Sequence, residues 1–167
     1  HWTTALPDTL GTNRNDTIAK IWEMVAPEYK TQECQHQLSF LSIKDFCDPD
    51  SPSSAWPNLG GKGAQVRALL PILTLLFERT YRRHIQFERM IAKMMRALTD
   101  FYACIDHTDA DGKHPYYLPD EVLADMQGHC DKFLWFYTWL TADAAKAGRP
   151  LFHKTSKFHS LWHLSQD

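Results

Sequence analysis

The chain has 167 residues, of which 44% are hydrophobic, 13% aromatic and 23% charged. A chain of this length and apolar content can bury roughly two-thirds of its unfolded surface, which excludes an intrinsically disordered protein. The formal net charge of −2 is too small to indicate a partner by itself. No apolar run reaches the ~18 residues of a membrane span, since the run at 69–77 contains Pro71 and stops at Glu78.

Charge is distributed unevenly along the chain. Residues 62–96 carry eight Lys or Arg against two Glu, whereas residues 100–131 carry eight acidic side chains against Lys113 alone. Blocks of opposite sign that follow each other most often neutralise each other across a fold. A basic surface left open for an anionic partner is the alternative.

The first third of the chain predicts two helical segments. A first helix is expected to begin at Asn15 or Thr17 and to end at about residue 26, before Pro27. Residues 31–46 are expected to form a second helix, although the apolar alternation in the middle of this segment also fits a short strand.

The middle of the chain changes from a loop to a mostly apolar helix. Three Pro, three Ser and three Gly predict an internal loop at residues 47–63. Residues 64–80 then predict a helix with little polar surface, which we expect to be the most buried element, at the centre of the molecule. Because Pro71 lies inside this segment, we expect either a kink or two helices that meet at Leu70.

The clearest amphipathic pattern is at residues 82–105. At about 100° per residue, the apolar side chains fall on one broad side: Phe87, Met90, Ile91, Met94, Leu98, Phe101 and Ile105. Four cations, the basic row, fall on the other side within a sector of about 60°: Arg82, Arg89, Lys93 and Arg96. Glu78 and Asp100 lie four residues beyond either end of the basic row, so we expect part of it to be ion-paired along the helix.

The last third predicts two more helices after a polar loop at residues 106–115. Pro119 is expected to open the first of them, and Gly148 and Pro150 to stop it at about residue 147. A final helix is predicted at residues 156–164. No strand pairing or internal repeat is indicated, so the chain is predicted to be one all-α domain over residues 1–167, an irregular bundle of five or six helices.

Histidine spacing at the end of the chain raises the question of a metal site. His159 and His163 are four residues apart on the last predicted helix, a spacing at which two imidazoles can chelate a metal ion such as zinc. Candidate third ligands are His153, His129 and Cys130. Packing of the two imidazoles on a polar helix face is the commoner explanation of such a pair, so we expect no cofactor.

The four cysteines form no CxxC pair. A site built from Cys104, His107 and Cys130 is conceivable if two helices form a hairpin, but structural zinc sites usually have tighter pairs. Free, buried thiols in an intracellular protein are the expectation. A Cys34–Cys47 bridge remains open if the chain is secreted.

Two glycine-containing segments resemble ligand-binding loops without meeting their requirements. Gly112 occupies the sixth position of an EF-hand frame, but His107 and Leu118 stand where the first and last ligands belong, so we expect ordinary turn chemistry. Residues 60–63 precede a helix but lack the P-loop pattern and a preceding strand, which favours a flexible connection. Nothing in the sequence is specific enough to name a reaction.

Three stretches resemble segments of uncharacterised, transposon-related proteins of protist and fungal genomes: residues 10–13 (LGTN), 62–71 (KGAQVRALLP) and 157–164 (KFHSLWHL). The last is similar to His-rich helices of some cut-and-paste transposases. The resemblance implies a helical accessory part of a larger DNA-handling protein. The catalytic carboxylates of such enzymes lie on an RNase H-like sheet, which is not predicted here, so no catalytic residue is carried over.

These observations predict a non-catalytic interaction domain of a larger, mobile-element-derived protein. We also expect this chain to be a fragment, since His1 is neither an initiator methionine nor the start of a signal peptide. It is expected to be intracellular, with the nucleus among its locations, and to make no membrane contact; the sequence leaves its oligomeric state open.

A basic helix face is expected to contact nucleic acid or a partner protein through six residues: Arg79, Arg82, Arg83, Arg89, Lys93 and Arg96. The alternative is a metal-binding bundle or metal-dependent enzyme that uses His159 and His163.

Overall fold

A computed structural model describes residues 14–31, 36–42, 63–109, 112–148, 152 and 156–165. Within these ranges it contains five α-helices and no strand. The helices are α2 (Arg14–Thr31), α3 (Gly63–Thr80), α4 (Gln86–Ile105), α5 (Asp120–Lys146) and α6 (Ser156–Leu164). The prediction of an all-α fold is therefore confirmed for the described part of the chain.

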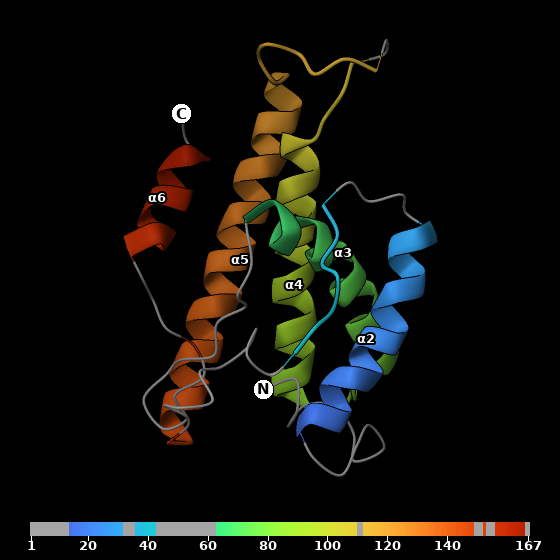
Figure 1. The fold of residues 1–167 in the computed structure, drawn as a ribbon. Coiled ribbons are helices and arrows are strands. Elements are labelled where there is room, and N and C mark those ends of the chain that lie inside the picture. Colours follow the sequence, from blue (N-terminus) through green and yellow to red (C-terminus); the bar gives the residue numbers. More distant parts are fainter. Residues whose placement is uncertain are drawn as a thin grey trace.

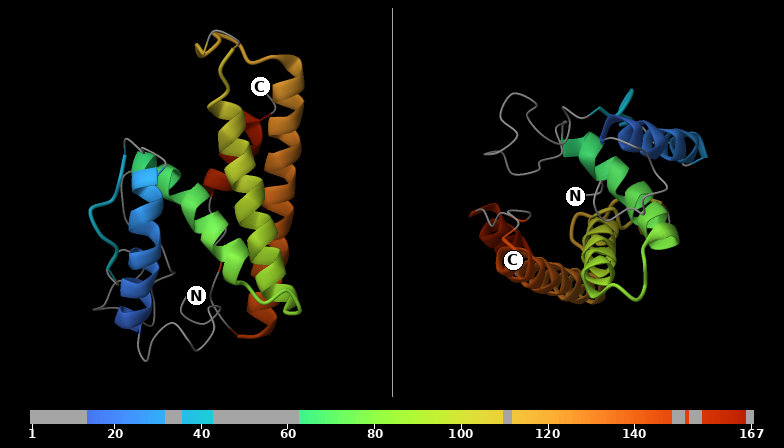
Figure 2. Two further views of the ribbon diagram at one scale, coloured as in Figure 1. Left: turned by 90° about the vertical axis from the view of Figure 1, so that its right-hand side faces the viewer. Right: turned by 90° about the horizontal axis from the view of Figure 1, so that it is seen from below.

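The helices follow each other in space in the order in which they follow each other in the sequence. α4 and α5 form a long antiparallel hairpin, with α3 packed against α4 (Figure 1). α2 lies beyond α3, and α6 lies against α5 on the other side, so that the five helices form a curved row (Figure 2). Among the helices of the described ranges, none is both long and apolar enough to cross a membrane.

α2 continues beyond the end that the sequence predicts. Pro27 lies inside the helix on its exposed side, where its missing N–H removes one hydrogen bond to the carbonyl of Glu23. The last turn is nevertheless held in place, because Val25 is 0% and Tyr29 1% exposed in the core. Burial of these side chains outweighs the lost backbone bond, so the predicted end near residue 26 is wrong.

The segment after α2 is neither a helix nor a strand over residues 36–42. Leu41 is buried there, and the Gln37 side-chain amide donates to the Tyr29 carbonyl at 3.3 Å. These contacts hold the segment against the helices without regular backbone pairing, and the predicted helix or strand is wrong for these residues. The rest of the predicted segment lies outside the described residues, as does the predicted loop at 47–63 apart from Gly63.

α3 is a single helix that contacts both α2 and α4. Pro71 is on its exposed side, so the ring removes a backbone hydrogen bond without disturbing the packed face. The expected alternative of two helices meeting at Leu70 is wrong. The buried side of α3 consists of Leu69, Ile72, Leu73, Thr74, Leu76 and Phe77.

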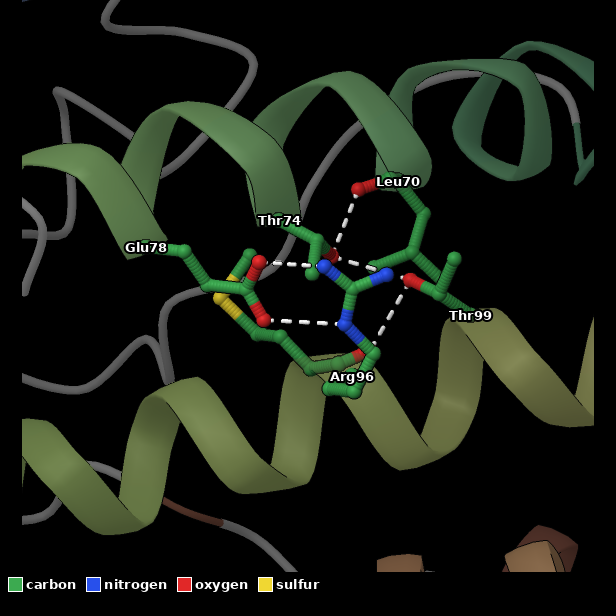
Figure 3. A network of polar contacts seen from close by, with 6 residues as sticks. Leu70, Thr74, Glu78, Arg96 and Thr99 are labelled. Carbon is green, nitrogen blue, oxygen red and sulfur yellow. Dashed lines mark hydrogen bonds and ion pairs between the residues drawn. The ribbon is translucent and has the colours of Figure 1, made fainter.

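A small network of hydrogen bonds joins α3 to α4 within this apolar surface (Figure 3). The Thr74 hydroxyl lies 2.8 Å from the Leu70 carbonyl and 2.9 Å from the hydroxyl of Thr99. Thr99 in turn lies 2.9 Å from the carbonyl of Met95. Thr74 is only 1% exposed, so these contacts give its hydroxyl the partners that a buried polar group needs.

The core has two parts, and α4 contributes to both. The larger cluster joins α2, α3 and α4 and includes Leu140 of α5. The smaller cluster consists of Phe101, Met126 and Cys130, with Leu161 of α6 packed against it.

Two of the four cysteines, Cys104 and Cys130, lie in the described ranges, and both are free. Cys130 is fully buried and its thiol donates to the Leu161 carbonyl at 3.8 Å. Burial raises the pKa of both thiols, which keeps them protonated at neutral pH. The expectation of a free, buried thiol is confirmed for Cys130.

The connection between α4 and α5, residues 106–119, contains a polar turn among its described residues. The backbone N–H of Asp109 donates to the Lys113 carbonyl at 2.8 Å, and the Asp109 carboxylate accepts the Lys113 N–H at 2.8 Å. Gly112 has a φ of 75°, a conformation that other residues adopt at a cost. These bonds confirm the predicted turn chemistry at Asp109, Gly112 and Lys113.

Candidate functional site

The structure divides the six cations of the predicted contact surface into two groups. Three form ion pairs with glutamates: Arg79 with Glu28, Arg82 with Glu88, and Arg96 with Glu78. The other three, Arg83, Arg89 and Lys93, are exposed and form no ion pair within the described ranges. Only the second group has its charge free for a partner.

Neutralisation between the basic and acidic blocks accounts for little of this pairing. Arg67 pairs with Asp106 and so joins the two blocks. Arg79, Arg82 and Arg96 instead use glutamates that lie before residue 100. Within the described ranges, the acidic segment that follows in the chain therefore provides no ion-pair partner for the exposed cations.

Arg82 lies in a turn, where it binds a buried glutamate, and not on the surface of a helix. Residues 81–85 form a turn, and α4 begins only at Gln86. Glu88, at the third position of the helix, is 2% exposed and accepts the backbone N–H of Arg82 at 2.7 Å and its Nε–H at 2.8 Å. The predicted start of the helix at residue 82 is therefore wrong, and so is the place of Arg82 in the basic row.

Arg96 also forms an ion pair, with Glu78, but its side chain is exposed. Its Nε–H donates to Glu78 of α3 at 2.9 Å, and a terminal nitrogen donates to the second carboxylate oxygen (Figure 3). The hydrogen bonds to Glu78, opposed by partial burial, raise the pKa of the Arg96 guanidinium. Glu78 therefore pairs across two helices, and not along one helix with Arg82 as the spacing predicts.

Two of these exposed cations, Arg83 and Lys93, line an open groove of about 480 Å³ between the end of α3, α4 and α5, the basic groove. Its lining consists of four cations, two carboxylates, three rings and two alanines: Arg83, Lys93, Arg96, Lys132, Glu78, Asp100, Tyr81, His129, Phe136, Ala92 and Ala97. Since Arg96 already pairs with Glu78, the remaining charge is that of three cations against Asp100. The groove is therefore electropositive.

The shape of the groove follows from small residues between large ones. Ala92 and Ala97 of α4 are 5% and 3% exposed, and their short side chains leave space where longer ones would fill it. Phe136 of α5 forms part of the wall, with Lys93 Nζ 5.8 Å from the centre of its ring. That distance fits a cation–π contact, so Lys93 lies over an accessible aromatic face.

The sequence does not indicate the part of this groove that α5 provides. Lys132, Phe136 and His129 come from α5, some forty residues beyond the basic row, and only the antiparallel hairpin brings them opposite Lys93. His129 also lies 4.0 Å from Asp100 of α4. The sequence does show that Lys132 and Phe136, four residues apart, share one face of a helix. It does not show which other helix this face lies against.

Arg89, also named in the basic row, does not line the groove. It is exposed on α4 and stands apart from the other free cations. Arg79 is likewise outside it, paired with Glu28 of α2 at 3.3 Å.

His159 and His163 do share one face of α6, as predicted. Their Nε2 atoms are 3.0 Å apart, a distance at which one ring N–H donates to the nitrogen of the other. Both side chains are exposed, and Trp162 packs beside them with its ring centre 5.0 Å from that of His163. His153 lies outside the described residues.

No group of three or more His, Cys, Asp or Glu side chains within the described ranges is arranged to hold a metal ion. This applies to the set of Cys104, His107 and Cys130 and to the histidine pair. His129 and Cys130 are adjacent in sequence but point to different neighbours, Asp100 and the Leu161 carbonyl.

Comparison of the chain with protein-family models, with curated proteins and with solved structures gave no match. The function proposed below therefore depends on the geometry of the basic groove.

Proposed function

We propose that this domain binds nucleic acid through the basic groove, without catalysing a reaction on it. One observation carries the proposal: Arg83, Lys93 and Lys132 come from three separate segments to one groove, and none of them forms an ion pair within the described ranges. Such cations displace the counterions condensed on the phosphates of a nucleic acid, and this gives binding that weakens as salt rises.

The choice of nucleic acid over a protein partner rests on the composition of the groove. The cores of protein–protein interfaces are depleted in lysine and other charged residues. Here lysines provide two of the three free cations, beside the aromatic side chains of Tyr81 and Phe136. Cations interleaved with rings favour a phosphate-bearing strand.

A binding role without catalysis is supported by what lines the groove. The lining contains no serine, threonine or cysteine that would act as a nucleophile. Its carboxylates, Glu78 and Asp100, are engaged with Arg96 and lie near His129, respectively.

As part of the same proposal, the domain is an accessory region of a larger, mobile-element-derived protein that handles DNA in the nucleus. The resemblance of residues 62–71 and 157–164 to transposon-related proteins supports this. The described parts of these stretches lie on α3 and α6 and not in the groove. They bear on the origin of the domain and not on how it binds.

Fluorescence anisotropy with labelled oligonucleotides tests the groove. We expect binding at low salt that weakens steeply towards physiological salt, and a logarithmic salt slope that falls by about two in Lys93→Glu/Lys132→Glu, since two phosphate contacts are lost. The matched control is Lys30→Glu/Lys113→Glu, which changes net charge equally at residues that do not line the groove.

The control should retain the slope of the unmodified protein. Absence of any binding at low salt would overturn the proposal. An equal loss in both double variants would also overturn it, because net charge and not the groove would then govern binding.

A further inference from the structure

We infer that the basic groove takes an unpaired nucleotide, so that the domain prefers single strands to duplex; this deepens the proposed function and rests on it. Cations alone do not distinguish a single strand from a duplex, because both present phosphates. The distinction comes from the rings beside the cations, since the face of a base is accessible in a single strand and covered in a duplex.

Phe136 provides the surface against which a base can stack. Its side chain is half-buried, so the ring is held by α5, and Lys93 Nζ lies 5.8 Å from its centre. An ammonium group in that position can move to a phosphate and leave the ring face to a base. Lys93 and Phe136 thus place a phosphate contact and a stacking contact next to each other.

A second aromatic surface adjoins the groove. Trp135 is 57% exposed, an unusual position for the largest apolar side chain, and its ring centre is 5.1 Å from that of Phe136. Tyr81, also in the lining, is stacked on Phe77 with ring centres 5.8 Å apart, which fixes its orientation. The two rings are at 80° to each other and Trp135 lies outside the groove lining, so Trp135 offers a separate stacking surface next to that of Phe136.

The dimensions of the groove agree with a small flat ligand. Its volume of about 480 Å³ falls within the range of roughly 300–1,000 Å³ that holds drug-sized molecules. An unpaired nucleotide belongs to that size class. Because Arg83, Lys93 and Lys132 are all exposed, a duplex could contact the cations, but its paired bases could not stack on the rings.

The experiment compares three ligands at one low salt concentration by fluorescence anisotropy: a thymidine oligomer, an abasic strand of the same length and a duplex. The abasic strand keeps the phosphates and lacks the bases. We expect the thymidine oligomer to bind about tenfold or more tightly than either of the others, as stacking of even one base predicts. This comparison uses the unmodified protein and is independent of how variants fold.

Two variants then locate the stacking contact. Phe136→Leu keeps an apolar side chain without a ring, and should remove the preference for thymidine over the abasic strand. Tyr117→Leu, a matched loss of an exposed ring in the α4–α5 connection, should retain the preference.

Equal affinity for the thymidine oligomer and the abasic strand would overturn the inference. So would a preference that Phe136→Leu leaves intact. In either case the proposed function stands if binding still requires Lys93 and Lys132. If none of the three ligands binds, both the inference and the proposed function fail.

Discussion

Glu88 is a buried carboxylate whose partners come from the turn before its own helix. A carboxylate at the third position of a helix commonly caps the N-terminus by accepting a nearby backbone N–H. Here it reaches the N–H of Arg82, which precedes the helix by four residues, together with the Arg82 side chain. The contact fixes the direction in which the chain enters α4, and with it the place of Arg83 at the groove.

We expect Glu88→Gln to lower the free energy of unfolding by about 1–3 kcal/mol, because the variant keeps the shape but loses the charged acceptor of three hydrogen bonds in a buried place. Urea denaturation followed by circular dichroism measures the change. Glu23→Gln, at an exposed position of α2, serves as the control and should alter stability by less than about 0.5 kcal/mol. A similar small change in Glu88→Gln would contradict this role.

Residue-scale contacts were the least predictable from the sequence. The helical projection places Arg82 with Arg89, Lys93 and Arg96 because periodicity assumes that the helix already includes residue 82. A turn at 81–85 breaks that assumption, and nothing in the local sequence shows that a buried glutamate would reach back across it. Periodicity likewise places the predicted contact surface on one helix face, whereas Lys132 of the basic groove belongs to α5.

At the scale of the helix, the two internal prolines are at odds with the backbone around them. Pro27 and Pro71 both lie on exposed sides, so neither contributes to the core. Each removes a backbone hydrogen bond and crowds the preceding turn. Each helix stays continuous despite this cost, because its neighbouring side chains pack in the core: Tyr29 in α2, and Leu69 and Ile72 in α3.

Pro71→Ala should therefore stabilise the protein. The restored N–H can donate within α3, and the gain of roughly 3 kcal/mol in helix preference is reduced by about 1 kcal/mol, because alanine frees the unfolded chain. We expect a net increase of about 1–2 kcal/mol in the free energy of unfolding, measured by urea titration. Pro27→Ala, in the last turn of α2, provides a second site, and a loss of stability in both variants would contradict the explanation.

The helices themselves were largely predictable. α3, α5 and α6 lie within a few residues of their predicted bounds, because their apolar spacing and stop signals agree with the packing. Two errors have a common cause. Pro27 predicts the end of α2, and the apolar spacing near Leu38 predicts a helix or a short strand, but in both cases long-range contacts with the core outweigh the local signal.

On the scale of the whole molecule, stability is expected to be graded along the row of helices. α4 packs against α3 on one side and α5 on the other, whereas α2 and α6 each lie at an end of the row. α6 is anchored by few side chains, among them Phe158, whose ring centre is 4.4 Å from that of Tyr137. Elements with few buried contacts open locally before the molecule unfolds.

Hydrogen–deuterium exchange with mass spectrometry should show this gradient, with the amides of α4 exchanging most slowly and those of α6 fastest among the helices. Phe158→Ala should speed exchange in α6 by about tenfold or more, as loss of a partly buried ring predicts, and leave α4 unchanged. If exchange in α4 increases to the same extent, the two helices unfold as one unit and the gradient is wrong.

The α4–α5 hairpin separates charge along its length. The tip carries Asp106, Asp109, Asp120, Glu121 and Asp125 with Tyr116 and Tyr117 exposed among them, while the free cations lie nearer its other end. This separation of charge gives the hairpin an electric dipole. Near a polyanion the molecule therefore rotates so that its positive end approaches first. The two tyrosines then face away from the bound strand, and encounters are already oriented before any contact forms.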